Sequence, residues 1–509
     1  MVRCRRNDMA RDRRPLYITI AEEILSDFSG WSGEAERRLP REMALAERYQ
    51  VSRATVREAL RLLERDGAVR SKHGIGTFMV GETENVAPVP EEPTRPGTVS
   101  GGPTAAAGAD AKAPAMPLSR PEANDLTFVS TRVYGGQGQP FAGYVCTSGG
   151  KIAAVGPGAP PQGAGRVIDA GDNRLIPGLI DLHIHGSAGT AVGDGDLDSL
   201  VRMARFLADN GVTAFQPTAQ AIPVPALENA IADVKELTRG PVRGARSIGL
   251  HMEGPFLNPE RGGAMPKGLL MKPDSELMAR WCDLGGGTVN HVTVAPELPG
   301  AIPLIEFLVS HGVTASAGHT SATYDQMLAG FRAGVTVGNH TYNAMRELRH
   351  REPGALGALL TQPGIYCEII ADCVHVHPAA MRLLIQAKGP DYVCLVTDAV
   401  AAAGMPPGEY SFLGRKVTVD ESGACRLPDG TLAGSTARLR ECLRNVVEVV
   451  GVPFDVALGM ATVNPAKAAR VFHRKGSLAP GKDADLVVLG DRYEVLWSVV
   501  EGEIQKSGE

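Results

Sequence analysis

The chain lacks any apolar run that approaches the roughly 20 residues needed for a membrane-spanning helix. Its basic first residues, MVRCRRNDMARDRR, are not followed by the apolar stretch of a secretory signal peptide. The eight cysteines include no CxxC pair and no regular spacing, so we expect buried free thiols. There is no internal repeat. These absences predict a soluble, cytoplasmic protein without a membrane partner.

Length and charge indicate more than one domain. At 509 residues the chain is too long for one ordinary domain. Residues 1–80 contain sixteen basic and twelve acidic residues, a local net charge of +4, and the rest of the chain has a net charge of −9. A basic N-terminal region on an acidic body suggests polyanion binding, although solvated helices often have the same excess.

Changes in composition predict four parts. Residues 1–80 have helical patterns that end in a glycine-punctuated hairpin, and residues 81–125 are rich in Pro, Ala, Gly and Glu. Because that second segment buries too little apolar surface to offset its ordering entropy, we expect a flexible linker. We expect short strands in 126–176 to pair with strand-like segments in 471–509, forming a small β-domain.

One unit recurs across residues 177–470: an apolar, β-branched run, a polar or glycine break, and a helical stretch. The eight runs are GLIDLHIH, GVTAFQPT, SIGLHMEG, HVTVAPE, GVTASAGH, VTVGNH, YCEIIAD and VCLVTDA. Eight strands with intervening helices are typical of a TIM-like (β/α)8 barrel of about 250 residues. The small β-domain would flank this barrel.

Ionisable residues fall at the ends of these runs: His183, His185, Glu253, His319, His340 and Asp398. A lone buried histidine is more often a hydrogen-bonded core residue. Here, however, all six fall where barrel strands deliver side chains to one pocket, and burying so many without a cation would be costly. Imidazole nitrogens and carboxylate oxygens suit a divalent zinc-type ion, and with a spare carboxylate they suit a hydrolase.

The motifs around these residues resemble one family. They are PGLIDLHIHG, LHMEGPF, AGHT, HTYNAM, REPG, ADCVH, LVTDA, LAGS, NPA and GSLAPGKDADLVV. In order and spacing, from about 126 to 492, they resemble the N-acetylglucosamine-6-phosphate deacetylases of the amidohydrolase superfamily. The resemblance implies hydrolysis of N-acetyl-D-glucosamine 6-phosphate to D-glucosamine 6-phosphate and acetate, in amino-sugar catabolism. The motifs do not distinguish this sugar from its galactosamine epimer.

The resemblance also implies a metal assignment. Glu253, His319 and His340 would hold the main ion, and His183 and His185, with Asp398 nearby, would hold a second if two are bound. We expect one or two divalent ions per subunit, zinc first, with Fe, Co or Mn as alternatives.

Roles for the remaining residues follow from the same resemblance. Asp398 would be the general base for the attacking water and then the acid for the departing amine. His375 would bind the sugar, while Asn343 and the Ala344 amide would hold the phosphate. Arg351 matches a phosphate-binding arginine that a neighbouring subunit usually provides, which predicts a homodimer; the alternative is a surface salt bridge.

Two departures from the family pattern bear on turnover. Met265 stands where the family usually has His or Gln near the substrate amide, and a thioether cannot donate a hydrogen bond. Losing one oxyanion donor can cost on the order of 10²–10³ in rate. Arg438 replaces part of a more apolar stretch and could reshape the sugar pocket. Met265 motivates an alternative in which the barrel only senses an amino-sugar phosphate.

The segment RLPREMALAERYQVSRATVREALRLLERDG predicts two helices joined by a turn at Val51–Ser52. The residues expected on the inner faces are Ala44, Leu45, Tyr49, Val56, Ala59, Leu60 and Leu63. Basic or polar residues occupy the outer face, as a major-groove helix requires. AVRSKHGIGTFMV then predicts two strands around HGIG, a wing. The alternative is an amphipathic helical pair with a solvated face.

This segment resembles the winged helix-turn-helix of GntR-type bacterial regulators. The resemblance implies binding to double-stranded operator DNA through Arg41, Arg53, Thr55, Arg57, Lys72, His73 and Gly76. Met43 stands where the family usually has arginine. We therefore expect a bifunctional protein, a deacetylase fused to a DNA-binding regulator, with a deacetylase carrying a vestigial head as a further alternative.

Overall fold

The protein forms two compact units, residues 1–112 and 113–509. The computed structural model describes residues 125–508 except 137, 241 and 413, together with residues 20–21, 23–24, 37–40, 42–49, 51, 56, 59–60, 63, 69–72 and 76–79. Among the described residues, none of the helices has the length and apolarity of a bilayer-spanning segment.

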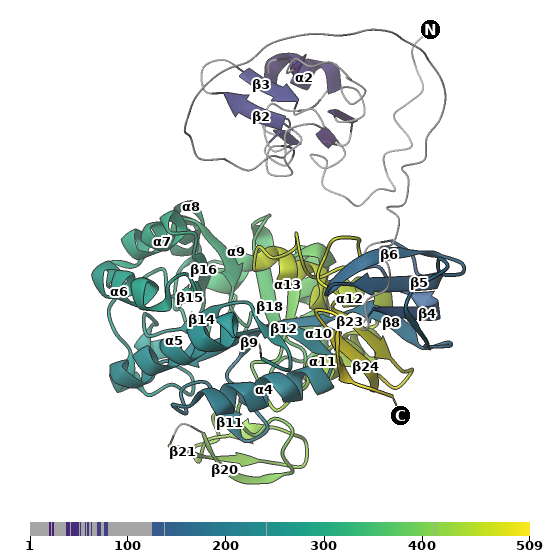
Figure 1. Ribbon diagram of the computed structural model, residues 1–509. Coiled ribbons are helices and arrows are strands. Elements are labelled where there is room, and N and C mark those ends of the chain that lie inside the picture. The colour runs from purple at the N-terminus through teal and green to yellow at the C-terminus, as the bar shows by residue number, and fades with distance from the viewer. Residues whose placement is uncertain are drawn as a thin grey trace, which may run out of the picture. The chain divides into compact units, whose positions relative to one another are not determined.

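The N-terminal unit combines helix α2 (Glu42–Tyr49) with a small antiparallel sheet. Strands β2 (Val69–Lys72) and β3 (Gly76–Met79) form the hairpin expected of a wing, and β1 (Arg37–Arg38) pairs with β3. Both labelled strands lie beside α2 in Figure 1.

A small apolar core joins the helical segments of this unit. Its members include Leu45, Val56, Ala59, Leu60 and Leu63, with Tyr49 packed against them. The prediction for Ala44 was wrong: Ala44 is exposed and Ala46 is buried instead.

The β-sheet that flanks the barrel is built from both sides of the barrel sequence. Its strands are β4 (Leu126–Val133), β5 (Phe141–Ser148), β6 (Lys151–Pro157), β7 (Arg166–Asp169), β8 (Arg174–Pro177), β23 (Leu486–Leu489), β24 (Val495–Val500) and β25 (Glu503–Lys506). The strand order is β25-β24-β23-β8-β4-β5-β6, with β7 paired to β4. The antiparallel pairing of β23 with β8 therefore joins the last strands of the chain to the segment that precedes the barrel.

Eight parallel strands make the barrel, as the apolar runs predicted. They are β9 (Leu179–Ile184), β12 (Val212–Gln220), β14 (Leu250–Glu253), β15 (Val289–Val294), β16 (Thr314–Ala317), β17 (Val335–Gly338), β18 (Tyr366–Ile370) and β19 (Val393–Val396). Each pairs with the next in chain order, and a short β13 (Arg246–Ser247) also pairs with β12. A parallel bridge between Ile184 and Ala399 joins the last strand's end to the first.

A helix follows each barrel strand. In order these are α4 (Leu197–Asp209), α5 (Val224–Arg239), α6 (Ser275–Gly285), α7 (Ala301–Ser310), α8 (Tyr324–Ala333), α9 (Gly354–Thr361), α10 (Pro378–Lys388) and α11 (Leu439–Asn445). Polar side chains begin several of them: Asp196 accepts from the Ser199 amide at α4, and Thr323 forms a capping box with Gln326 at α8. A π-helix (Val446–Val450), α12 (Phe454–Ala461) and α13 (Val463–Ala468) complete the helical part.

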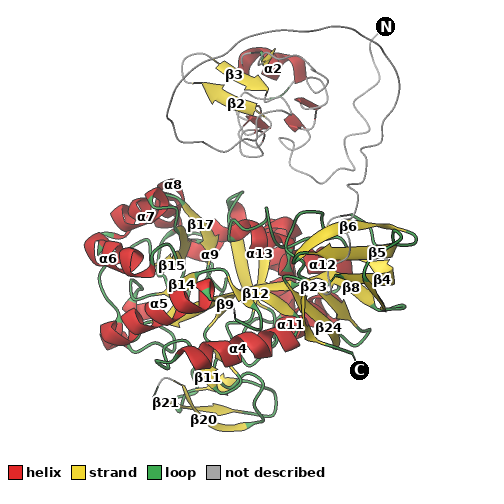
Figure 2. Ribbon diagram, viewed as in Figure 1, coloured by secondary structure: helices red, strands yellow, loops and turns green. Residues whose placement is uncertain are grey.

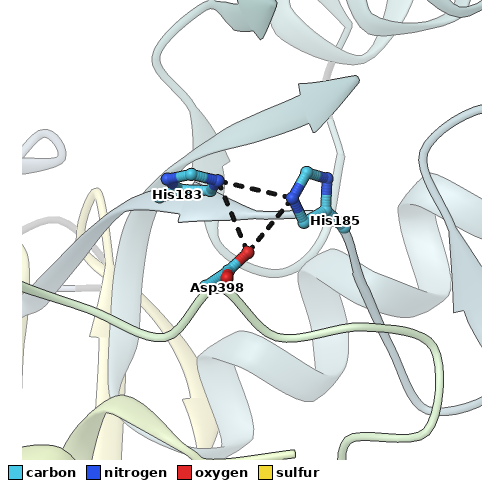
Figure 3. Close-up of side chains that lie close together, drawn as sticks. All are labelled: His183, His185 and Asp398. Carbon is cyan, nitrogen blue, oxygen red and sulfur yellow. Dashed lines mark hydrogen bonds and ion pairs between the residues drawn. The ribbon is translucent and has the colours of Figure 1, made fainter. Parts of the chain in front are cut away.

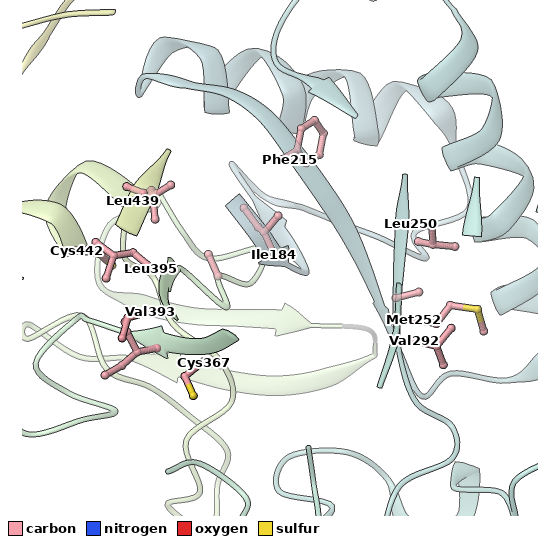
Figure 4. Packing of buried hydrophobic residues seen from close by; sticks show 14 of the residues in the cluster. Ile184, Phe215, Leu250, Met252, Val292, Cys367, Val393, Leu395, Leu439 and Cys442 are labelled. Carbon is pink, nitrogen blue, oxygen red and sulfur yellow. The ribbon is translucent and has the colours of Figure 1, made fainter. Parts of the chain in front are cut away.

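The main core lies between the strands and these helices. Alternate strand residues such as Phe215, Leu250 and Val292 point away from the barrel interior and belong to this core. Leu439 and Cys442 contribute to it from α11 (Figure 4). Burying this outer face fixes which strand residues point to the barrel interior, where the ionisable side chains lie.

Short elements surround the end of the barrel at which the strands terminate. They are the hairpin β10 (Gly186–Ser187) and β11 (Thr190–Ala191), the 3₁₀ turns Pro259–Arg261 and Lys267–Leu269, and the strands β20 (Gly408–Phe412), β21 (Arg415–Val419) and β22 (Cys425–Arg426), while a third 3₁₀ turn, Pro390–Tyr392, precedes β19 at the other end. Strands β20, β21 and β22 form one antiparallel sheet inserted between β19 and α11. The apolar runs did not predict this insertion.

Candidate active site

A cavity of about 410 Å³ opens where the barrel strands end. Its walls include five of the six ionisable residues expected at the strand ends: His185, Glu253, His319, His340 and Asp398. His183, the sixth, is fully buried directly behind them. The barrel therefore brings the six side chains together, as parallel strands that end at one edge should.

The first group of ligand atoms comes from β9 and the end of β19 (Figure 3). Nε2 of His183 lies 3.3 Å from Nε2 of His185. Oδ1 of Asp398 lies 3.5 Å from the first nitrogen and 3.1 Å from the second. The Asp398 amide donates to the His183 carbonyl at 2.8 Å, which holds the two strand ends together.

The second group comes from β14, β16 and β17. Glu253 Oε1 lies 3.1 Å from Nε2 of His319 and 2.8 Å from Nε2 of His340, and these two nitrogens are 3.0 Å apart. Glu253 Oε2 lies 3.2 Å from Nε2 of His185. Glu253 thus faces both groups, and its Oε1 also lies 3.4 Å from Nε2 of His183.

Hydrogen bonds orient three of the four imidazoles. Nδ1 of His183 lies 3.2 Å from Glu368, that of His185 lies 3.0 Å from the Thr218 carbonyl, and that of His319 lies 2.7 Å from the Arg261 carbonyl. Because carbonyl and carboxylate oxygens only accept, each Nδ1 carries the proton. In the neutral form of each ring, Nε2 then presents a lone pair to the cluster, the arrangement typical of metal-binding histidines.

The charges at the cluster favour a cation. Burial disfavours the ionised form of Asp398, but the His183 and His185 rings outweigh it and lower the pKa of Asp398 to about 2. Burial likewise disfavours the charged form of His185, yet its hydrogen bonds to Asp398 and Glu253 raise the pKa of His185 to about 9. Two buried carboxylates thus make positive charge favourable at the point where the ligand atoms meet.

These donors fit a zinc-type ion. Bonds of about 2.0–2.1 Å to a tetrahedral ion place neighbouring ligand atoms about 3.3 Å apart. Within each group the ligand atoms lie 2.8–3.5 Å apart. Nitrogen and carboxylate donors without thiolates also suit Fe, Co or Mn.

Four of the expected substrate-contacting residues line the same cavity: Met265, Asn343, Ala344 and His375. Nδ1 of His375 donates to Asp372 at 2.7 Å, and this carboxylate outweighs burial and raises the pKa of His375. Asn343 and Ala344 follow β17, next to His340, and the Ala344 carbonyl accepts from the Thr320 amide.

Two expected residues lie elsewhere. Arg351 is exposed and does not line the cavity within this chain. The expectation that Arg438 reshapes the sugar pocket was wrong, because Arg438 immediately precedes α11, pairs with Glu441 at 2.8 Å and is absent from the cavity wall.

The expected DNA-contacting residues Arg41, Arg53, Thr55, Arg57 and His73 lie outside the described residues. Lys72 ends β2 and Gly76 begins β3, so these two flank the tip of the wing. Their roles stay predictions.

Sequence reasoning did not single out several residues of the site. Glu368 contacts His183 from β18, and the cavity wall also includes Gln220, Phe412, Arg426 and residues 431–434. An acidic residue inside the apolar run YCEII was a signal for Glu368, since an isolated buried charge is costly. Arg426 had no such signal, because it comes from the inserted sheet; it is the one lysine or arginine among the described residues of the wall.

Three residues of the cavity wall have a strained backbone. His319, Ala344 and Asp398 have φ of 46°, 51° and 49°, in the left-handed region that non-glycine residues rarely adopt. Each such residue costs on the order of 1–3 kcal/mol and persists where the surrounding structure fixes it, often at functional sites.

Two family models match the chain. The model of the amidohydrolase family matches residues 174–504, and that of bacterial regulatory proteins of the gntR family matches residues 16–79. The first covers the barrel with part of the flanking sheet, and the second covers the N-terminal helices and the wing.

Curated relatives match about two thirds of the chain. N-acetylglucosamine-6-phosphate deacetylase of Bacillus subtilis (strain 168) is 37% identical over 366 residues, which are 71% of this chain and 92% of the relative. N-acetylgalactosamine-6-phosphate deacetylase of Escherichia coli O157:H7 is 37% identical over 330 residues, 65% of this chain and 87% of the relative.

Solved structures show the same likeness. A mutant N-acetyl-D-glucosamine-6-phosphate deacetylase of Mycobacterium smegmatis, in complex with N-acetyl-D-glucosamine-6-phosphate, has a TM-score of 0.71 at 35% identity, covering 75% of this chain and 100% of that one. The N-acetylglucosamine-6-phosphate deacetylase of Pasteurella multocida has a TM-score of 0.71 at 32% identity and covers 75% and 99%.

Proposed function

Since the chain belongs to the amidohydrolase family and carries a GntR-type domain ahead of its barrel, we propose that it hydrolyses N-acetyl-D-glucosamine 6-phosphate to D-glucosamine 6-phosphate and acetate. One observation carries this proposal: five of the six candidate metal ligands and four of the residues expected to contact the sugar phosphate line a single cavity. The volume of about 410 Å³ suits a small polar substrate.

The amidohydrolase family is metal-dependent, and we assign zinc to this chain, as one or two ions. Glu253, His319 and His340 would hold the main ion, and His183 and His185 with Asp398 the second. When bound, such an ion polarises the amide carbonyl and makes water acidic enough to attack at neutral pH.

Asp398 moves the proton in this proposal. Its lowered pKa of about 2 keeps it ionised at neutral pH, so it can accept a proton from the attacking water. The same carboxyl then delivers that proton to the amine nitrogen as the C–N bond breaks. His319, whose Nδ1 donates to the Arg261 carbonyl, would keep its Nε2 turned toward the cluster as a ligand.

The other cavity residues would orient the sugar phosphate. His375, held by Asp372, donates from Nε2 to a sugar hydroxyl. Asn343 and the Ala344 amide bind phosphate oxygens, and Arg351 of a second copy would add a bidentate contact. This arrangement requires a homodimer, in which each cavity receives Arg351 from the other subunit.

The N-terminal unit would bind operator DNA in the cytoplasm, with the second helix in the major groove and the wing at the backbone or minor groove. Arg53, Thr55 and Arg57 would contact the groove, and Arg41, Lys72, His73 and Gly76 would add further contacts. The fusion suggests that the same sugar phosphate controls DNA affinity, which requires a different affinity in the free and bound states.

Acetate release tests the enzymatic proposal. We expect the zinc-loaded full-length protein to release acetate from N-acetyl-D-glucosamine 6-phosphate, and Asp398→Asn to lower kcat by about 10²–10⁴. The galactosamine epimer in parallel measures sugar specificity. The alternative of a barrel that senses without turnover is not favoured, because the relatives are deacetylases; zinc and sugar phosphate bound without acetate release would restore it.

A further inference from the structure

We propose that Glu368 is a positioning residue for the ligand group of His183, His185 and Asp398, and that it sets the affinity of that group for its divalent ion. The inference rests on the proposed function only in that the group binds such an ion. It assigns no contact between Glu368 and substrate.

Glu368 is a fully buried carboxylate in the middle of β18. Its neighbours Cys367 and Ile369 belong to the apolar core between the strands and the helices, so alternation turns Glu368 to the opposite face, toward the barrel interior. An ionised carboxylate buried there would be very costly without a nearby cation and good hydrogen bonds.

The hydrogen bonds of Glu368 lead to the metal-ligand cluster. Oε2 accepts from Nδ1 of His183 at 3.2 Å and from the backbone amide of His340 at 3.3 Å. Oε1 is buried and has no hydrogen-bond partner among the residues that the structure describes. The carboxylate therefore makes both of its side-chain hydrogen bonds with residues of the cluster, one through a ring and one through the backbone.

The hydrogen bond from Nδ1 of His183 to Glu368 decides which nitrogen of the His183 ring can bind a metal ion. A neutral imidazole has one N–H and one lone pair, and the carboxylate can only accept, so the proton is held on Nδ1. The lone pair of Nε2 then faces His185 and Asp398. Without this acceptor, the proton could move to Nε2 and remove His183 as a ligand. An anionic acceptor also makes the imidazole a stronger donor to a metal.

The hydrogen bond that Glu368 accepts from His340 does not involve the imidazole ring. It involves the backbone amide, so it fixes the end of β17 and leaves the His340 ring untouched. Removing the charge of Glu368 should therefore weaken the first ligand group and spare the group of Glu253, His319 and His340.

Zinc titration of the full-length protein, after its metal is removed, tests this inference. A chromophoric chelator that competes for zinc reports stoichiometry and affinity without substrate. We expect two equivalents in the wild type; in Glu368→Gln, one equivalent at unchanged affinity and one about 10–100-fold weaker. Glu297→Gln is the matched control, because Glu297 accepts hydrogen bonds at the end of β15 without contacting a ligand side chain, and it should bind like the wild type.

If Glu368 had a purely structural role, Glu368→Gln would weaken the binding of both ions together. An equal loss of affinity for both ions in a folded Glu368→Gln protein therefore overturns the inference. Unchanged binding of both ions in Glu368→Gln would also overturn the inference. So would a wild-type protein that takes up only one equivalent of zinc. If the glutamine variant does not fold, Glu368→Asp, which keeps the charge but is one methylene shorter, should weaken only the second ion, by about tenfold; unchanged binding would overturn the inference. Two bound ions without acetate release would instead contradict the proposed function.

Discussion

Met265 forms part of the cavity wall near the predicted position of the substrate amide. It is buried and packs in a small apolar cluster with Ala221 and Leu257. Its thioether cannot donate a hydrogen bond to an oxygen that gains negative charge. Turnover by this chain should therefore be limited at this side chain.

We predict that Met265→Gln raises kcat for the sugar phosphate, by about tenfold or more, because one regained donor is worth up to about 10²–10³. Met265→Leu keeps the volume without adding a donor and should leave kcat within about threefold of the wild type. Steady-state acetate release measures both. Equal kcat in the glutamine and leucine variants would show that no donor is missing at this position.

At the residue scale, the sequence predicted which ionisable side chains gather at the strand ends better than it predicted the residues around them. His183, Glu253 and Asp398 could be found because they end apolar strands, a position with a fixed direction in a barrel. Glu368 could not be assigned, because its role depends on the distance between β18 and β9, which pairing and register set. Arg351 could be named, but it is exposed and lies away from the cavity of its own chain.

At the scale of elements, a buried ion cluster joins the end of the barrel to the flanking sheet. Nζ of Lys475, fully buried, lies 2.6 Å from Asp485 and 2.9 Å from Asp483, which also pairs with Lys151 at 2.6 Å. Burial would raise the pKa of Asp483, but Lys475 and Lys151 outweigh it and lower the pKa to about 2. Its ordinary value is 3.8.

This lowered pKa predicts a pH-dependent contribution to stability. A carboxyl with a lower pKa in the folded state stabilises the fold at pH values above its unfolded pKa and loses this effect as the pH falls toward its folded pKa. We expect Asp483→Asn to lower stability by about 1–2 kcal/mol at pH 7, allowing for solvent screening. The difference from the wild type should shrink between about pH 4 and pH 2.

Thermal melting of both proteins across this pH range measures the effect. Asp491→Asn is the control, because Asp491 pairs with Arg132 at the surface with 73% of its side chain exposed, where ion pairs contribute little. A melting difference for Asp483→Asn that is constant from pH 7 to pH 3 would rule out the linkage.

The strands and helices of the barrel could be predicted because one sequence pattern repeats in them. Eight strands could be predicted because each is an apolar, β-branched run followed by a helix. The inserted strands β20, β21 and β22 were missed because exposed and buried residues alternate in short segments there, without a long apolar run. This insertion brings Phe412 and Arg426 to the cavity, so the missed element changes the picture of the site.

At the scale of the whole molecule, the N-terminal part and the rest of the chain have net charges of opposite sign. The first 80 residues have a net charge of +4 and the rest −9. A basic domain gains affinity for DNA from counterion release, while the acidic body does not compete for the same sites. The two-part fold class could be predicted from composition and motifs.

We predict that the full-length protein binds a palindromic DNA upstream of its own gene, and that Arg53→Ala/Arg57→Ala weakens this binding by about 1–3 kcal/mol for each lost base contact. Binding should weaken steeply with salt. Fluorescence anisotropy at several salt concentrations measures both, and adding sugar phosphate tests the proposed control. Equal affinity of the double variant and the wild type would favour a vestigial head.

Metal removal tests the central claim, that the cluster of four histidines, Glu253 and Asp398 binds a divalent ion used for deacetylation. The experiment measures acetate release from N-acetyl-D-glucosamine 6-phosphate by chelator-treated protein, with metal content determined on the same sample. The account predicts no release without metal and full recovery when zinc is restored. Undiminished release from folded protein whose transition-metal content is far below one equivalent would contradict it.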